Sequence, residues 1–130
     1  MEGLEEVVRA LRARYRLHAV ILFGSRARGD WGPWSDYDIL ILADFDEPYP
    51  DRIKGVLEAL KDVRLPVEPH PYTVEEAVEM LRRGCPTVVD ALEEGVVLYS
   101  SGRLGELRAL YEDMRRRGLR RSRTTIVLPG

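Results

Sequence analysis

The stretch Leu22–Leu42, LFGSRARGDWGPWSDYDILIL, places charged and turn-forming residues between two strongly apolar ends. The runs Ala19–Phe23 (AVILF) and Tyr37–Ala43 (YDILILA) are short and rich in strand-forming residues, so we expect two buried strands here. A plain hairpin between two strands needs neither a Gly-Ser pair with arginines nor an Asp-x-Asp. The connection is therefore a candidate binding site.

The first half of this connection is suited to phosphate. A strand end followed by the start of a helical turn offers backbone N–H groups to an anion, and glycine leaves that backbone accessible. Arginine adds a permanent positive charge that can donate two hydrogen bonds to one phosphate. A turn with arginines is also an ordinary surface feature. The candidate nucleotide-binding residues are Gly24, Ser25, Arg26 and Arg28.

The second half has the opposite charge. Asp36 and Asp38 lie two residues apart at the expected start of the second strand, so strand alternation should direct both side chains to one face. Two carboxylates about 5 Å apart repel by roughly 3 kcal/mol at an effective dielectric constant near 20, unless a cation lies between them. Oxygen ligands favour Mg²⁺ or Mn²⁺ over zinc. A solvated strand end is the plain alternative, but the two halves together predict binding of a nucleoside triphosphate with two Mg²⁺ ions.

The spacing of these residues resembles a known motif. Gly24-Ser25, ten residues and Asp36-x-Asp38 resemble the Gly-Ser-x10-Asp-x-Asp motif of the DNA polymerase β-like nucleotidyltransferase superfamily. The longer run GSRARG…SDYDILIL resembles the minimal nucleotidyltransferases, with the pattern GSRARGxxxxxSDxDLxV, over Gly24–Ile41 without insertion. The later run YTVEEAVEML…VVDALEEGVVLY is similar more loosely. The resemblance implies an α/β (α+β) fold, with a small mixed sheet flanked by helices.

The resemblance also implies roles for the motif residues. Asp36 and Asp38 would ligate the metal, Ser25 and nearby backbone would hold the triphosphate, and Arg26 or Arg28 would assist. The family normally has a third carboxylate on a later strand, as metal ligand or as base toward the acceptor hydroxyl.

Glu68, in LPVEPHP, is the best candidate for that third carboxylate. Its proline-rich segment departs from the family pattern and can only be an edge or irregular strand. A solvated edge residue is the plain alternative. The other candidate carboxylates are Asp62, Asp44 and Asp46.

The activity implied by the resemblance is Mg²⁺-dependent transfer of AMP from ATP to an acceptor hydroxyl. The implied acceptor is a tyrosine of a small all-helical HEPN toxin, which makes this chain the antitoxin of the pair. Two alternatives stay open: transfer to a small molecule, as in aminoglycoside nucleotidyltransferases, and an antitoxin that acts by binding without catalysis. The residues themselves support only the nucleotide half of this hypothesis.

The bulk composition sets limits on location and partners. The length of 130 residues predicts a single domain over 1–130, and 45% hydrophobic with 32% charged residues is an ordinary globular composition. One cysteine, Cys85, excludes an intramolecular disulfide, and with no apolar run of membrane-spanning length we expect a cytoplasmic protein without membrane contact. A net charge of −2 does not favour nucleic acid, although the arginine-rich segment Arg115–Arg123 leaves that partner possible.

The remaining sequence predicts further helices and strands by its periodicity. Thr73 and Glu76 form a capping-box pattern that should open a helix ending at Gly84. His70 either assists the site or is a surface residue, and Trp31 and Trp34 either contact a ligand or partner or pack the loop. The other expected elements are helices over 4–16, 51–60, 87–94 and 104–117 and strands over 63–72 and 96–99.

Overall fold

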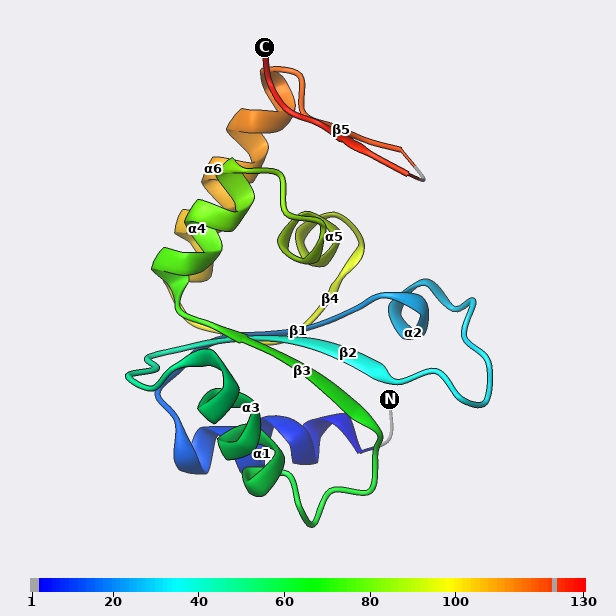
Figure 1. Ribbon diagram of the computed structural model, residues 1–130, viewed down its shortest axis with the longest axis vertical. Helices are drawn as coiled ribbons and strands as arrows, with labels where there is room; N and C mark the ends of the chain where they lie inside the picture. Colours follow the sequence, from blue (N-terminus) through cyan, green and yellow to red (C-terminus); the bar gives the residue numbers. More distant parts are fainter. Residues whose placement is uncertain (1–2, 123) are drawn as a thin grey trace.

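The computed structural model describes residues 3–122 and 124–130, and its centre is a four-stranded mixed sheet with helices on both faces (Figure 1). The strand order is β3-β2-β1-β4; β1 pairs antiparallel with β2 and β4, and β3 runs parallel to β2. The expected edge position of the proline-rich strand is confirmed, because an edge strand pairs on one side only. The strands are β1 Leu17–Phe23, β2 Tyr37–Ala43, β3 Val67–Tyr72 and β4 Val96–Ser100.

The helices divide between the two faces of the sheet (Figure 1). Helices α1 (Leu4–Arg14) and α3 (Tyr49–Ala59) cover one face, and α4 (Val74–Arg82), α5 (Pro86–Glu94) and α6 (Leu104–Arg116) cover the other. Among the described residues, no helix combines the length and the apolar character needed to cross a membrane.

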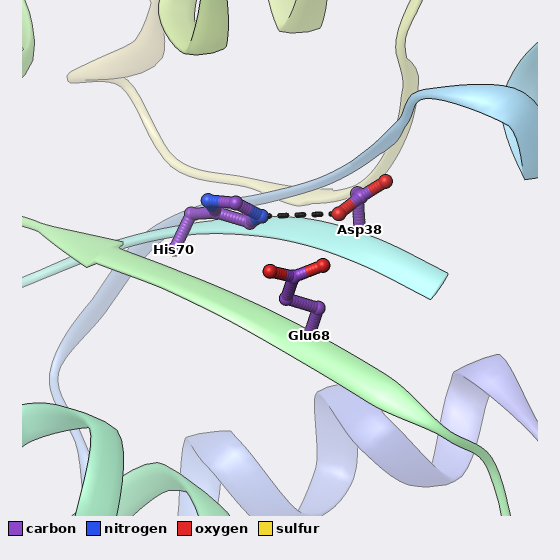
Figure 2. A group of neighbouring side chains, drawn as sticks. All are labelled: Asp38, Glu68 and His70. Carbon is purple, nitrogen blue, oxygen red and sulfur yellow. Dashed lines mark hydrogen bonds and ion pairs between the residues drawn. The ribbon is translucent and has the colours of Figure 1, made fainter. Parts of the chain in front are cut away.

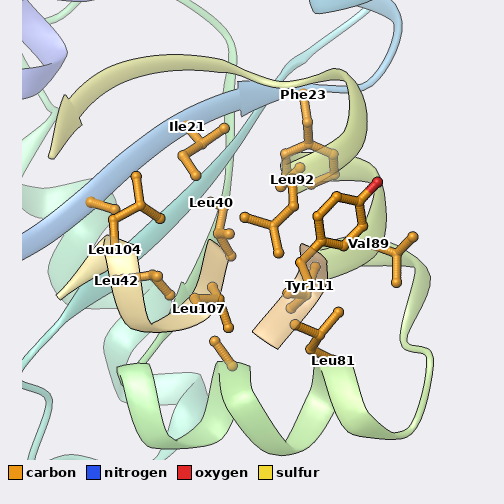
Figure 3. Close-up of a cluster of buried hydrophobic side chains, with 14 of the residues drawn as sticks. Ile21, Phe23, Leu40, Leu42, Leu81, Val89, Leu92, Leu104, Leu107 and Tyr111 are labelled. Carbon is orange, nitrogen blue, oxygen red and sulfur yellow. The ribbon is translucent and has the colours of Figure 1, made fainter. Parts of the chain in front are cut away.

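Each face of the sheet has its own hydrophobic core because strand side chains alternate. In β1, Val20 and Leu22 pack toward α1 and α3, whereas Ile21 and Phe23 pack toward α4–α6. Figure 3 shows the core between the sheet and helices α4–α6, where side chains of β1 and β2 pack against side chains of the three helices. Both central strands are consequently buried on both faces, as their continuous apolar runs predicted.

Several element boundaries differ from the expectations, and two of them concern segments that carry prolines. Helix α3 begins at Tyr49 after Pro48, two residues earlier than expected, so that Asp51 lies in its first turn. Pro50 is compatible with this start, because the first turn of a helix does not use its backbone N–H groups within the helix. Strand β3 begins at Val67, four residues later than expected.

Shorter elements complete the chain. Helix α2 (Ser25–Arg28) follows β1 directly, and β5 (Arg120–Arg121) pairs antiparallel with β6 (Ile126–Val127) near the C-terminus. The expected capping box is present: Thr73 Oγ1 accepts from the Glu76 N–H at 3.1 Å, and Glu76 accepts from the Thr73 N–H at 2.8 Å. Arg123 lies outside the described residues, so the arginine-rich segment is described only in part.

Candidate active site

The parallel pairing of β2 with β3 places two carboxylates side by side. Asp38 is the register partner of Glu68, and directly paired residues direct their side chains to the same face of a sheet. That face is the one covered by α4–α6, since Leu40 and Leu42 follow Asp38 in alternation and belong to that core. Asp38 retains 27% side-chain exposure and Glu68 is exposed, so solvent and ligands can reach both.

His70 completes a cluster of three side chains, shown in Figure 2. Its Nε2 lies 3.2 Å from Asp38 Oδ1, and its ring contacts Phe23 edge-on with centroids 5.1 Å apart. One ligand atom from each of Asp38, Glu68 and His70 lies within 4.8 Å of the others. The His70 side chain is only 20% exposed, so the alternative that His70 is a surface residue is wrong.

The charges of the cluster are not balanced internally. The pKa of the Glu68 carboxyl is raised above its ordinary value, first by its hydrogen bond to Asp38, then by partial burial and by the negative charge of Asp38. The charge of His70 acts in the opposite direction. A cation between the carboxylates would relieve this repulsion, and two oxygens with one imidazole nitrogen are suitable donors for a divalent metal ion.

Gly24 lets the turn after β1 approach this cluster. Its φ of 78° and ψ of −159° lie in a region that is essentially restricted to glycine. A Cβ atom at this position would lie 2.6 Å from Asp38 Oδ2, well inside van der Waals contact. The backbone of the Gly24-Ser25 turn therefore lies directly beside the Asp38 carboxylate.

Asp36 lies somewhat apart from the cluster. It is exposed and precedes the first residue of β2, Tyr37, and its carboxylate is not among the three groups that converge within 4.8 Å. It is nevertheless close enough for its negative charge to contribute to the raised pKa of Glu68.

Arg26 and Arg28 are both engaged with other groups of the protein. The Arg26 guanidinium lies over the rings of Trp31 and Tyr37, at 4.2 and 4.3 Å from their centroids. Its Nε and Nη2 donate to the Ser35 carbonyl at 3.1 and 3.0 Å. Arg26 thus fastens the connecting loop, a role with no local signature because its partners lie five to eleven residues further along.

Arg28 forms ion pairs from α2, through Nη1 to Glu94 at 2.8 Å and through Nε to Asp30 at 3.2 Å. Trp34, at the tip of the loop, is 91% exposed, and Trp31 is 51% exposed although it stacks on Arg26. The loop tip therefore presents a large aromatic surface to solvent.

The three alternative carboxylates lie elsewhere. Asp44 follows the opposite end of β2, where it pairs with His18 at 2.7 Å, and the pKa of Asp44 is lowered mainly by that hydrogen bond. Asp46 lies in the loop that leads to α3, and Asp62 lies in the turn after α3. Of the four carboxylates considered, Glu68 alone belongs to the cluster with Asp38.

Comparison with known proteins gives the same general picture. A family model described as a nucleotidyltransferase domain matches residues 4–98. A Methanocaldococcus jannaschii protein named "Putative protein adenylyltransferase" is 48% identical over 50 residues, which are 37% of this chain and 50% of the relative. The bifunctional uridylyltransferase/uridylyl-removing enzyme of Pseudomonas entomophila is 33% identical over 81 residues, or 61% of this chain. The chain spans half the length of the first relative and 9% of the second.

Solved structures resemble the chain over most of its length. A chain of a toxin–antitoxin crystal structure with AMP-PNP superposes with a TM-score of 0.56 at 18% identity, covering 89% of this chain and 88% of that one. A chain from tri-AMPylated Shewanella oneidensis HEPN toxin in complex with MNT antitoxin gives 0.51 at 16% identity, covering 88% and 84%. At these identities the likeness concerns the fold, and it confirms the expected fold class.

Proposed function

Because the chain belongs to the nucleotidyltransferase domain family, we propose that it transfers AMP from ATP to a hydroxyl group of a partner protein. The observation that supports this most directly is the pairing of Asp38 with Glu68 beside the Gly24-Ser25 turn. That arrangement places acidic metal-binding groups next to a turn whose accessible backbone suits a phosphate.

The acidic residues would hold the divalent metal ions of the reaction. Asp36, Asp38 and Glu68 supply oxygen ligands, which suit Mg²⁺, and the repulsion that raises the pKa of Glu68 would be relieved by a cation. A bound divalent ion would neutralise charge on the triphosphate and favour the ionised form of the acceptor hydroxyl.

The Gly24-Ser25 turn would hold the triphosphate through its backbone and the Ser25 hydroxyl. Arg26 would act indirectly, without contacting the triphosphate, because it holds the loop that joins this turn to Asp36 and Asp38. Arg28 would reach a phosphate only by leaving Glu94 and Asp30.

The acceptor would reach the α-phosphorus from the open side of the cluster. Glu68 is the exposed carboxylate of the cluster, so it can take the proton of the acceptor hydroxyl. The hydroxyl oxygen forms the new bond to the α-phosphorus, and pyrophosphate leaves. A tyrosine of a HEPN toxin is the acceptor that we propose, with this chain as the antitoxin. Support comes from the relative named as a protein adenylyltransferase and from the fold shared with toxin–antitoxin complexes.

The test combines the purified chain, ATP labelled at the α-phosphate, Mg²⁺ and a HEPN protein encoded beside it. We expect label on a tyrosine of the HEPN protein, mapped by mass spectrometry. Asp38→Asn and Glu68→Gln should each reduce labelling by ~100-fold or more, and 100-fold corresponds to about 2.7 kcal/mol of lost charge stabilisation.

Asp62→Asn is the matched control, because it removes a carboxylate in the turn after α3 and should label the partner normally. Equal labelling by Asp38→Asn would overturn the proposal. Label found only on small hydroxyl compounds would assign a different acceptor class. Neutralisation of the toxin by an Asp36→Asn, Asp38→Asn double variant would make binding, rather than transfer, the function.

A further inference from the structure

We infer that His70 is a nitrogen ligand of the metal site and that it shifts the metal preference of this chain toward Mn²⁺. The inference rests on the proposed function for the presence of a divalent ion at Asp38 and Glu68. It adds a donor that the sequence motif does not contain, and with it a prediction about which ion the site prefers.

The distances within the cluster are compatible with ligation of one ion. His70 Nε2 and Asp38 Oδ1 lie 3.2 Å apart. Two adjacent ligands of an octahedral ion, each at roughly 2.1 Å from it, lie roughly 3 Å from each other. The distance between His70 Nε2 and Asp38 Oδ1, which form a hydrogen bond here, is therefore also close to the distance expected between two neighbouring ligands of one ion. The third donor, from Glu68, lies within 4.8 Å of both.

The fold holds the imidazole in this orientation. Glu68 and His70 are two residues apart on β3 and so share one face of the sheet, the face to which Asp38 also points. Phe23 packs edge-on against the imidazole from β1, and the side chain of His70 is largely buried. Figure 2 shows one ring nitrogen directed at Asp38, with the Glu68 carboxylate beside it.

The chemical consequence concerns metal selectivity. Mg²⁺ prefers an all-oxygen environment, whereas an imidazole nitrogen is a good ligand for transition-metal ions. Replacing one oxygen position by nitrogen raises the affinity for Mn²⁺ relative to Mg²⁺. If His70 instead only donated a hydrogen bond to Asp38, it would be a positioning residue and the bound ion would contact oxygen alone.

Mn²⁺ alone, added to the intact chain, is the probe that separates these roles. We expect pulsed electron paramagnetic resonance of the bound ion to show coupling to an imidazole ¹⁴N, which changes to the ¹⁵N pattern when histidine is ¹⁵N-labelled. The sequence contains two histidines, and His18 lies by Asp44 beyond the far end of β2. His18→Gln is therefore the matched control and should retain the coupling, whereas His70→Gln should lose it.

Affinities provide a second readout. His70→Gln should weaken Mn²⁺ binding much more than Mg²⁺ binding, measured by titration calorimetry without nucleotide. Loss of only a hydrogen bond to Asp38 would instead weaken the binding of both ions together, by about tenfold or more. Bound Mn²⁺ without nitrogen coupling in the unsubstituted chain would overturn the inference, and that measurement needs no variant to fold.

The outcomes also separate this inference from the proposed function. Nitrogen coupling without transfer to any partner would leave His70 as a ligand and overturn the transfer activity. AMP transfer with a purely oxygen-ligated ion would retain the activity and overturn the role of His70. Failure of Mn²⁺ to bind would overturn the role of His70 and leave the transfer activity to the labelling experiment.

Discussion

At the scale of single residues, the site depends on how closely the Gly24 backbone approaches Asp38. The antiparallel register of β1 with β2 pairs Phe23 with Asp38, so the residue after Phe23 must turn away beside the carboxylate. Glycine is required there for two separate reasons: the backbone conformation and the space that Asp38 Oδ2 occupies. A side chain would have to move the carboxylate that we propose as a metal ligand.

Gly24→Ala should therefore damage both stability and metal binding. The strained backbone should lower the free energy of unfolding by about 1–3 kcal/mol, and displacement of Asp38 should weaken Mn²⁺ binding. Chemical denaturation and metal titration would measure the two effects. Gly32→Ala in the same loop is the control, since a Cβ atom there meets open space. A Gly24→Ala protein as stable and as metal-competent as the Gly32→Ala protein would contradict this view of the turn.

At this scale the sequence predicted which segments lie together better than it predicted individual contacts, and the roles of the motif residues stay predictions. The Gly-Ser and Asp-x-Asp halves do converge at Asp38, since this requires only adjacent strands in antiparallel pairing. Arg26 looked like a phosphate ligand because its charge is visible in the sequence. Its contacts with the Trp31 and Tyr37 rings depend on the path of the loop, which sequence periodicity does not encode.

At the scale of elements, Arg52 links two helices on opposite faces of the sheet. Its side chain is buried on α3, and its two terminal nitrogens donate to Glu76 of α4 at 2.7 and 3.1 Å. Arg52 Nε also donates to the Glu47 carbonyl at 2.8 Å. The sequence predicted Glu76 as part of the capping box, but not as the partner of a residue 24 positions earlier. The pair holds α3 and α4 together around the C-terminal end of the strand that carries Glu68.

Arg52→Met should lower the free energy of unfolding by about 1–3 kcal/mol at neutral pH. This loss is smaller than that for a broken, fully buried ion pair, because Glu76 keeps 43% side-chain exposure and can be hydrated when its partner is removed. Chemical denaturation is the measurement. Lys54→Met, an exposed position on the same helix, is the control and should change stability little.

The same pair predicts a pH dependence. The pKa of Glu76 lies below its ordinary value of 4.5, mainly because of the hydrogen bond from Arg52. A carboxyl with a lowered pKa in the folded state contributes stability above pH 4.5 and loses it as the pH falls through the folded-state pKa. The stability difference between the wild-type protein and Arg52→Met should thus be constant from pH 7 to about pH 4.5 and shrink as the pH falls from there toward 3. A difference that stayed constant over this range would exclude the ion pair as its source.

At the scale of the whole molecule, the C-terminal third completes the core beneath the site. The family model ends at residue 98, yet α6 contributes Leu104, Leu107 and Tyr111 to the core over which β1 and β2 lie (Figure 3). The amphipathic pattern predicted α6 as a helix. Its packing against β1 and β2 could be expected too, because both central strands are apolar on both faces and the second face must be covered. We propose that residues 1–130 form one cooperative domain.

Cooperativity can be tested with two probes of one unfolding transition. The tryptophans, Trp31 and Trp34, lie in the loop beside the site, whereas far-ultraviolet circular dichroism reports mainly the helices. Leu107→Ala, at a fully buried position of α6, should cost about 2–5 kcal/mol, and both probes should shift to lower denaturant concentration together. Leu57→Ala is the control, because the same truncation at a side chain 48% exposed should have a small effect. If the tryptophan transition stayed in place while the circular dichroism transition moved, the loop and its strands would fold independently of α6, and the chain would consist of two units.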